Sequence, residues 1–312
     1  MATANVLLFE RATPVFVDVD PLTLNITPQG VGAVIEREYV RRDGRLVRKS
    51  TGAPLVALLP VSVFGHPLEM DGFHALARAH GLRIVHDTCE AFGSLYWSGA
   101  RGAWVSEAAL ADAAVFAFYP NKQLTTGEGG MVVTQDEAIA TYCRMARNQG
   151  RRPGADWLEH ETLGFNYRMD ELSAALGVAQ MKRAPDLLAR RQQVAQWYDE
   201  ALSGVEEVER PQTAPWAQVA WFVYVIRVRP GIHRDGVIAQ LERRGIAAKP
   251  YFPPIHLAPH FRALGYRAGD FLVAEDVARR TVALPFFNAL TRDQVQEVAR
   301  SVKEAIFASV GD

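Results

Sequence analysis

The stretch that most constrains the fold runs from Ala114 to Thr134 and reads AVFAFYPNKQLTTGEGGMVVT. A β-rich apolar run at 115–118 stops before Pro120, and a second apolar run at 131–133 leaves a glycine-rich turn. Strand, turn and strand therefore hold one cation, Lys122, at the edge of a sheet. Two interpretations are open for this lysine: a solvated loop cation, or an amine placed for chemistry.

A second polar group follows an earlier strand. Residues 81–94 read GLRIVHDTCEAFGS, in which a buried-looking strand ends in Asp87. Open α/β sheets contact ligands at the carboxyl ends of their strands. An enzyme that uses pyridoxal phosphate (PLP) needs a lysine amine for a Schiff base and a carboxylate against the pyridine nitrogen. Asp87 and Lys122, in this order, supply both groups.

Four motifs make the hypothesis specific: VHDTCEAFGS, FAFYPNKQLTTGEGGMVVT, RNQGRR and LGFNYRMDELSAALGVAQM. Together they resemble the DegT/DnrJ/StrS family of PLP-dependent sugar aminotransferases. The similarity extends from ATPVFVDVDPLTLNITP to YFPPIHLAPHF and TVALPFFNALT, and so covers nearly all of the chain. The resemblance implies the α/β fold of aspartate aminotransferase (fold type I), a mostly parallel central sheet flanked by helices, with a small C-terminal α+β domain.

The resemblance also implies roles for single residues. Lys122 matches the Schiff-base lysine and Asp87 the partner of the pyridine nitrogen. Glu90 falls where the family commonly has Gln or His near the phenolic oxygen of the cofactor. Asn166 matches an asparagine that reaches the PLP phosphate of a neighbouring subunit, which implies a homodimer with shared active sites. The expected substrate is a nucleotide-linked keto-sugar and the expected amino donor is glutamate. Lysine rather than histidine at position 122 argues against the dehydratase branch.

Weaker expectations concern the phosphate and the substrate. Many relatives carry a serine at position 117 that bonds the PLP phosphate, and Tyr119 is the candidate substitute for the hydroxyl that Ala117 lacks. Tyr119 is also a candidate substrate contact. His256, in PPIHL, is a candidate substrate residue or a structural histidine beside two prolines.

A basic cluster offers a further substrate contact. Arg147, Arg151 and Arg152 fit a nucleotide diphosphate, since arginine pairs well with phosphate, or they form a solvated flexible loop.

The beginning of the sequence departs from the family pattern. Residues 1–10 predict an amphipathic helix, followed at once by a strand at 13–19. In the family this helix follows a segment with a strand, a glycine-threonine phosphate turn and an aromatic that stacks on PLP. We therefore expect a truncated chain with an incomplete phosphate site and an exposed apolar sheet edge. The alternatives to an active enzyme are a non-catalytic remnant that pairs with a full-length partner and a PLP-binding regulatory protein.

The chain divides into two predicted domains. Residues 1–204 form the large PLP-binding domain, which ends in a linking helix at 183–202, and residues 205–312 form the small domain after a proline-rich boundary. Further expectations are helices at 28–38 and 71–80, strands at 54–64, 219–228 and 246–251, a surface loop at 97–109 and a helix at 169–181 that is buried against the sheet or against a dimer partner.

Composition excludes several classes of function. The formal charge of −1 argues against a nucleic-acid surface. The two cysteines have no metal-ligand spacing, so no metal site is expected, and Cys89 beside Asp87 reads as an inert packing residue. No apolar run is long enough for a bilayer and no signal peptide is recognisable, so we expect no membrane partner and a cytoplasmic location.

Overall fold

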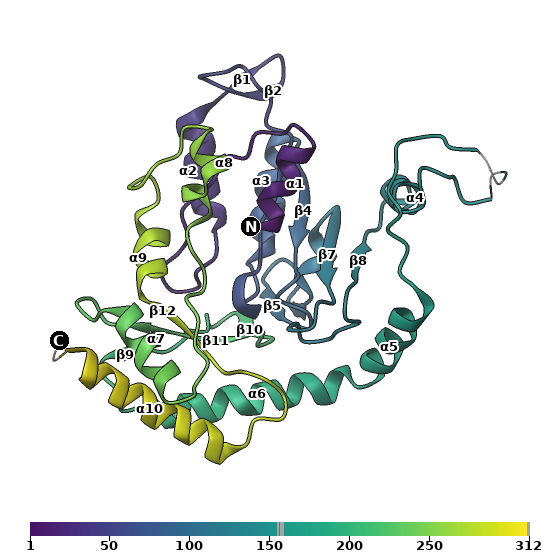
Figure 1. Cartoon of the computed structure of the whole chain (residues 1–312). Helices are drawn as coiled ribbons and strands as arrows, with labels where there is room; N and C mark the ends of the chain where they lie inside the picture. Colours follow the sequence, from purple (N-terminus) through teal and green to yellow (C-terminus); the bar gives the residue numbers. More distant parts are fainter. Residues whose placement is uncertain (155, 157–158, 311–312) are drawn as a thin grey trace.

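A four-stranded sheet carries the part of the chain that matters for function. The computed structural model describes residues 1–154, 156 and 159–310. The sheet has the order β3 (Ala57–Leu58), β4 (Arg83–Asp87), β7 (Ala113–Ala117) and β8 (Gly130–Val133). β3, β4 and β7 are parallel and β8 is antiparallel to β7, which agrees with the predicted mostly parallel sheet. The carboxyl ends of β4 and β7 therefore meet at one edge (Figure 1).

The helices α1 (Ala2–Phe9), α2 (Pro28–Glu38) and α3 (Met70–His80) lie beside this sheet (Figure 1). α2 has the predicted bounds because Thr27 accepts a hydrogen bond from Gly30 N and proline occupies the first turn. Its buried side chains join a first hydrophobic core that is made of Val31, Ile35, Tyr39, Leu46, Leu58, Leu68, Met70, Phe73, Ala77, Leu82, Ile84 and Tyr96.

This half of the molecule also contains two β-hairpins. β1 (Tyr39–Arg42) and β2 (Arg45–Arg48) are joined by Asp43 and Gly44, both at positive φ, the backbone conformation of a tight hairpin turn. The predicted surface loop at 97–109 is wrong: β5 (Leu95–Ser98) and β6 (Ala103–Val105) pair there, with β10 (Ala217–Gln218) beside β5, before the short helix η2 (Glu107–Leu110). Cross-strand pairing of two tryptophans favours the hairpin over a loop.

Two predicted strands of this half are also wrong or too long. Residues 13–19 pair with no described strand; instead the carboxylate of Asp18 accepts the backbone N–H groups of Val273 and Ala274 at the start of α9 (Leu272–Arg280). The strand expected at 54–64 is reduced to the two residues of β3, followed by an isolated bridge between Val61 and Asp87.

A second hydrophobic core forms the C-terminal half. β9 (Val208–Glu209), β11 (Tyr224–Val228) and β12 (Thr281–Leu284) make an antiparallel sheet of order β12-β11-β9. The helices α6 (Ala184–Ala201), α7 (Arg234–Arg243) and α10 (Arg292–Val310) complete it. The short η3 (Ile255–Leu257) comes just before α8 (Pro259–Arg262), and α8 lies beside the first half, where its Phe261 contacts Phe16 (Figure 1). The strand expected at 246–251 is only one bridge.

The long helix α6 links the two halves (Figure 1). Its C-terminal half belongs to the second core, because Val194, Tyr198 and Leu202 are all buried there. A domain boundary at residues 204/205 stays a prediction.

An arm extends from the sheet beyond β8 (Figure 1). It contains α4 (Glu137–Ala146) and α5 (Glu171–Lys182), and α5 leads into α6. The helix predicted at 169–181 exists, but no residue of α5 is buried, and Leu172 is 86% exposed. All residues of β8 are exposed as well. Apolar side chains are therefore open to solvent in this part of the single chain. Burial of the helix against the sheet is not observed, and its burial against a dimer partner stays a prediction.

Candidate active site

The side chain of Lys122 is withdrawn from solvent rather than free in a loop. It is only 13% exposed, its Nζ lies 3.4 Å from Oε1 of Glu90, and the same nitrogen lies 4.1 Å from the centroid of the Phe222 ring. The second oxygen of Glu90 accepts a hydrogen bond of 2.9 Å from the backbone N–H of Phe64. The structure therefore favours an amine held in place over a solvated loop cation.

Side chains from both halves of the molecule fix the turn that carries this lysine. Gln123 donates from its Nε2 to the carbonyl oxygens of Glu90 (2.6 Å) and Ala220 (2.8 Å). The buried guanidinium of Arg191, on α6, donates to the Lys122 carbonyl at 3.3 Å. The lysine thus lies where the two hydrophobic cores meet.

Asp87 ends β4, and both of its carboxyl oxygens accept hydrogen bonds. The backbone N–H of Cys89 donates to Oδ1 at 3.0 Å, and the hydroxyl of Thr3, on α1, donates to Oδ2 at 2.6 Å. Such contacts hold a carboxylate in one orientation. The contribution of Thr3 was not predicted, because no sequence pattern connects residues that lie 84 positions apart.

The charges of this group act on one another. Burial raises the pKa of the Cys89 thiol, Asp87 raises it further, and Lys122 opposes both. The thiol is therefore inert, in agreement with its predicted packing role. Burial also raises the pKa of Glu90, and the Lys122 amine lowers it in part. The three charged side chains consequently surround one small region at the carboxyl edge of the sheet.

The remaining predicted site residues are spread over the molecule. Tyr119 lies on the lysine turn and is 48% exposed. Asn166 is exposed on the arm, where its backbone forms a bridge with Asn148. His256 is buried, and its Nε2 lies 3.0 Å from Oε1 of Glu275. That pairing favours the structural interpretation of His256 over the substrate one.

A basic cavity lies on the arm, at the end of α4. Its volume is about 290 Å³, and it is lined by Arg144, Arg147, Asn148, Arg151, Pro153 and Arg168. None of these lining residues is acidic. The predicted cluster is therefore revised: Arg152 lies outside the cavity and pairs with Glu161 at 2.6 Å, while Arg144 and Arg168 take part.

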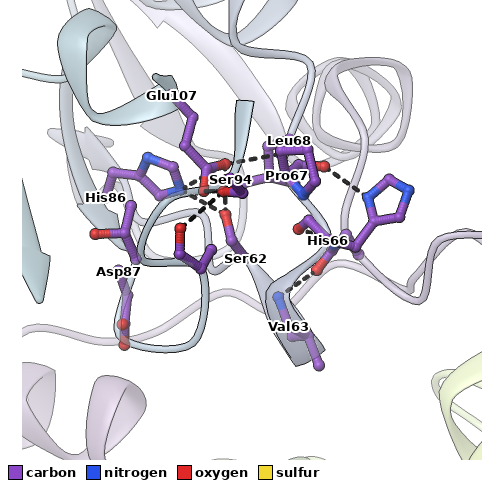
Figure 2. A network of polar contacts seen from close by, with 12 residues as sticks. Ser62, Val63, His66, Pro67, Leu68, His86, Asp87, Ser94 and Glu107 are labelled. Carbon is purple, nitrogen blue, oxygen red and sulfur yellow. Dashed lines mark hydrogen bonds and ion pairs between the residues drawn. The ribbon is translucent and has the colours of Figure 1, made fainter. Parts of the chain in front are cut away.

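A buried polar network lies behind Asp87, and Figure 2 shows it from close by. The hydroxyl of Ser62 lies between Nε2 of His86 (2.9 Å) and Oε2 of Glu107 (2.6 Å), and Ser94 Oγ lies 3.1 Å from Oε1 of Glu107. Burial raises the pKa of Glu107 to about 7 and lowers the pKa of His86 to about 4. A histidine that follows Ile84 and Val85 within β4 was the available signal for a buried partner, although it does not identify Glu107.

Two kinds of feature were not found in the part of the chain that the structure describes. No cluster of three or more His, Cys, Asp or Glu side chains there is arranged to hold a metal ion. Among the described helices, none combines the length and the apolar character that crossing a bilayer needs.

A lysine amine and an aspartate at the carboxyl edge of a mostly parallel sheet, joined to a smaller α+β half, define the class of PLP-dependent enzymes of fold type I. Comparison with known proteins gives the family. The family model described as the DegT/DnrJ/EryC1/StrS aminotransferase family matches residues 1–303, and the chain belongs to this family. It is thus an aminotransferase by family, and the cofactor is PLP.

Individual relatives support this placement. GDP-perosamine synthase of Caulobacter vibrioides is 32% identical over 309 residues, which cover 98% of this chain and 76% of the relative. Among solved structures, DesV of S. venezuelae has a TM-score of 0.82 at 32% identity and covers 97% of this chain and 75% of its own. PseC of Helicobacter pylori has a TM-score of 0.85 at 26% identity, with 98% and 77% covered. The chain therefore matches about three quarters of the length of these proteins.

Proposed function

We propose that this chain transfers an amino group to a keto-sugar carried on a nucleotide diphosphate, with glutamate as the amino donor. The observation that carries the proposal is the burial of Lys122 against Glu90 and Phe222 at the same sheet edge as Asp87. Relatives that are named as a GDP-perosamine synthase and as a dTDP-3-amino-3,4,6-trideoxy-alpha-D-glucose transaminase support the substrate class.

The residues at this edge fit the cofactor. Lys122 supplies the amine that would hold it covalently, and the Asp87 carboxylate, fixed by Thr3 and Cys89, supplies the partner for its pyridine nitrogen. Glu90, beside the amine, would face the phenolic side. When bound, PLP supplies a ring that withdraws electrons from the carbon that loses a proton.

Lys122 would also act as an acid–base group. Its free Nζ would take a proton from the donor carbon as a general base and return it as a general acid. The ring of Phe222 and the burial of the amine keep water away from this proton. Glu90, at 3.4 Å, is the group that orients the free amine.

The basic cavity is the proposed contact for the diphosphate of the substrate. Arg144, Arg147, Arg151 and Arg168 bring four guanidinium groups to one cavity without a carboxylate among its lining residues, and guanidinium groups pair well with phosphate oxygens. Tyr119 and His256 stay candidates for the substrate, the latter only if its bond to Glu275 opens.

A homodimer is the proposed assembly. Several apolar side chains of β8, of segment 163–167 and of α5 are exposed in the single chain, namely Met131, Val132, Leu163, Phe165, Leu172, Val178 and Met181. Asn166, within segment 163–167, is exposed as well. Contact with a second copy would cover this face and bring Asn166 to the cofactor phosphate of the partner.

The direct test is a titration of the purified protein with PLP, followed by visible absorbance. The wild type should gain the band of a lysine-bound cofactor and Lys122→Ala should not. Amino transfer from glutamate to nucleotide keto-sugars is then assayed. Absence of the band from the wild type would overturn the proposal.

A further inference from the structure

We infer that Glu107 is a positioning residue for the cofactor end of the site, and that it works as a neutral carboxylic acid. It holds the two loops that orient Asp87 and Glu90 and touches no reacting group itself. This inference rests on the proposed function, in which those two carboxylates contact the cofactor.

The first step is the place of Glu107 in the fold. Its side chain is 1% exposed, on η2, and its Oε2 accepts the backbone N–H of Leu68 at 2.8 Å and contacts the hydroxyl of Ser62 at 2.6 Å. Both residues belong to the loop 60–68. Its Oε1 contacts the hydroxyl of Ser94, at the end of the loop 88–95. One carboxyl group thus joins two loops that follow different strands (Figure 2).

Those two loops control the predicted cofactor contacts. In the loop 60–68, the Ser62 N–H donates to the Asp87 carbonyl at 3.0 Å and the Phe64 N–H donates to Oε2 of Glu90. Phe64 has φ of 60°, a left-handed conformation that a phenylalanine keeps only when its surroundings enforce it. The loop 88–95 contains Glu90 itself. Loosening either loop would therefore move a carboxylate of the site.

Counting hydrogens favours the neutral acid. Ser94 Oγ lies near two acceptors, Oε1 of Glu107 at 3.1 Å and the Ala91 carbonyl at 2.8 Å, but it has only one hydrogen. If Glu107 is ionised, one of these contacts lacks a hydrogen. If Oε1 is protonated, it donates to Ser94, which donates to Ala91. We assign the proton to Oε1 on this ground.

The rest of the network agrees with that assignment. With Ser62 donating to Oε2 of Glu107, Nε2–H of His86 donates to Ser62. Every contact then has one hydrogen, with both Glu107 and His86 uncharged. Burial raises the pKa of Glu107 to about 7, which agrees with a neutral form below neutral pH.

Among the described groups that face Glu107, none is a cation that would favour its ionised form. β4 presents His86, whose pKa burial lowers to about 4, and next to it the acidic Asp87. The two loops present hydroxyls and a backbone N–H. α3 also packs against η2, but its Asp71 is occupied by the hydroxyls of Tyr96 and Ser98.

Amide hydrogen exchange on the cofactor-free protein tests the role directly. Glutamine has the shape of the neutral acid and can donate from the same position, so Glu107→Gln should keep the protection of loops 60–68 and 88–95 within about twofold at pH 4.5, where Glu107 is protonated in the folded wild type. Glu107→Ala should lose about tenfold or more in both loops, because buried groups lose their partner. β11 serves as the internal reference.

Variants that remove only one hydrogen-bond partner of Glu107 keep the test decisive if Glu107→Ala does not fold. Ser94→Ala should loosen only the loop 88–95, and Ser62→Ala only the loop 60–68. Above pH 7 the wild type should exchange severalfold faster than Glu107→Gln in both loops, since only the wild type ionises. Full protection in the alanine variants, or loss of protection in Glu107→Gln at pH 4.5, would overturn the inference.

Measuring PLP binding distinguishes a failure of this inference from a failure of the proposed function. PLP should bind Glu107→Gln as it binds the wild type, and bind Glu107→Ala about tenfold more weakly. If the wild type binds no PLP, the proposed function fails, whereas the exchange pattern still decides whether Glu107 holds the two loops. If Glu107→Ala binds PLP as the wild type does, the positioning role fails alone.

Discussion

Two carboxyl groups withdrawn from solvent, those of Glu90 and Glu107, lie close to the carboxyl edge of the central sheet, and their surroundings differ. Glu90 has a cation beside it, with Nζ of Lys122 at 3.4 Å, while Glu107 is surrounded by Ser62, Ser94 and a backbone N–H. Burial raises the pKa of both groups, but only Glu90 has an amine that lowers it in return. Glu90 and Lys122 can therefore form a charged pair at the site, whereas the network around Glu107 holds a neutral acid.

The difference shows how one fold separates chemistry from support. An ion pair near the site gives a reactive amine a counter-charge, at a cost in desolvation. A neutral acid costs less to bury and fixes geometry when each of its oxygens has a hydrogen-bond partner, as both oxygens of Glu107 do. The backbone bond from Phe64 to Glu90 connects the two regions.

The largest expected effect follows from substitution of Lys122, the cation that distinguishes Glu90 from Glu107. Lys122→Ala removes both the amine and the partner of Glu90, so transaminase activity should fall by about a thousandfold or more. Lys122→Arg keeps a cation beside Glu90 without an amine that bonds the cofactor, and should be equally inactive but better folded. Steady-state assays with thermal melts check both variants, and residual activity above a few per cent in either would contradict the assigned role.

Removing the neutral acid should cost stability rather than chemistry. Glu107→Ala should lose about 2–4 kcal/mol of unfolding free energy, since it leaves a cavity and buried groups without partners. Glu107→Gln should stay within about 1 kcal/mol of the wild type at pH 4.5, below the range in which the wild type loses the contribution of Glu107. Urea unfolding measures both, and equal losses would mean that the network needs the charged form.

Stability against pH sharpens the comparison further. The pKa of Glu107 is raised from 4.5 to about 7, so its stabilising contribution is present below pH 4.5 and lost as pH rises to 7. The pKa of His86 is lowered from 6.5 to about 4, so its contribution is present above pH 6.5 and lost as pH falls to 4. In the wild type the two opposing trends overlap between pH 4.5 and 6.5.

Glu107→Gln removes one of these trends and leaves the other. Relative to the wild type, the variant should gain up to about 3 kcal/mol of stability between pH 4.5 and 7. Urea unfolding at several pH values gives this difference, and the wild type serves as the control for all other titrating groups. Parallel curves for the two proteins would show that Glu107 is ionised throughout.

The smallest expected effect lies on the arm. Arg147→Ala should weaken binding of a nucleoside diphosphate about tenfold, with a loss that diminishes at high salt. Arg152→Ala is the matched control, because Arg152 is paired with Glu161 outside the cavity. Calorimetric titration separates the two, and equal losses would assign the effect to general charge rather than to the cavity.

Local signals predicted much of the fold. α2 was placed correctly because a capping threonine, a proline at the start and apolar residues at helical spacing all agree. The hairpin β5–β6 was missed since glycines at its turn read as a loop. The strand at 13–19 was wrong because Asp18 is used to cap α9, 255 positions away, which no local pattern indicates.

Site residues could be predicted only where they lie at the end of a strand or shortly after it. Asp87 and Lys122 follow β4 and β7, and parallel strands bring their carboxyl ends together. The contacts of Thr3 and Glu107 join elements that are distant in sequence, and were not found. The arginine cluster was found in part, because Arg168 reaches the cavity by a turn of the arm rather than by sequence spacing.

The most direct test of the central claim is to locate the cofactor on the chain. PLP is added, the bond to lysine is reduced with borohydride, and the modified peptide is identified by mass spectrometry. We predict a pyridoxyl group on Lys122, and none on Lys49, Lys182, Lys249 or Lys303. Modification spread over these other lysines, or no modification of Lys122, would contradict the assignment of the site.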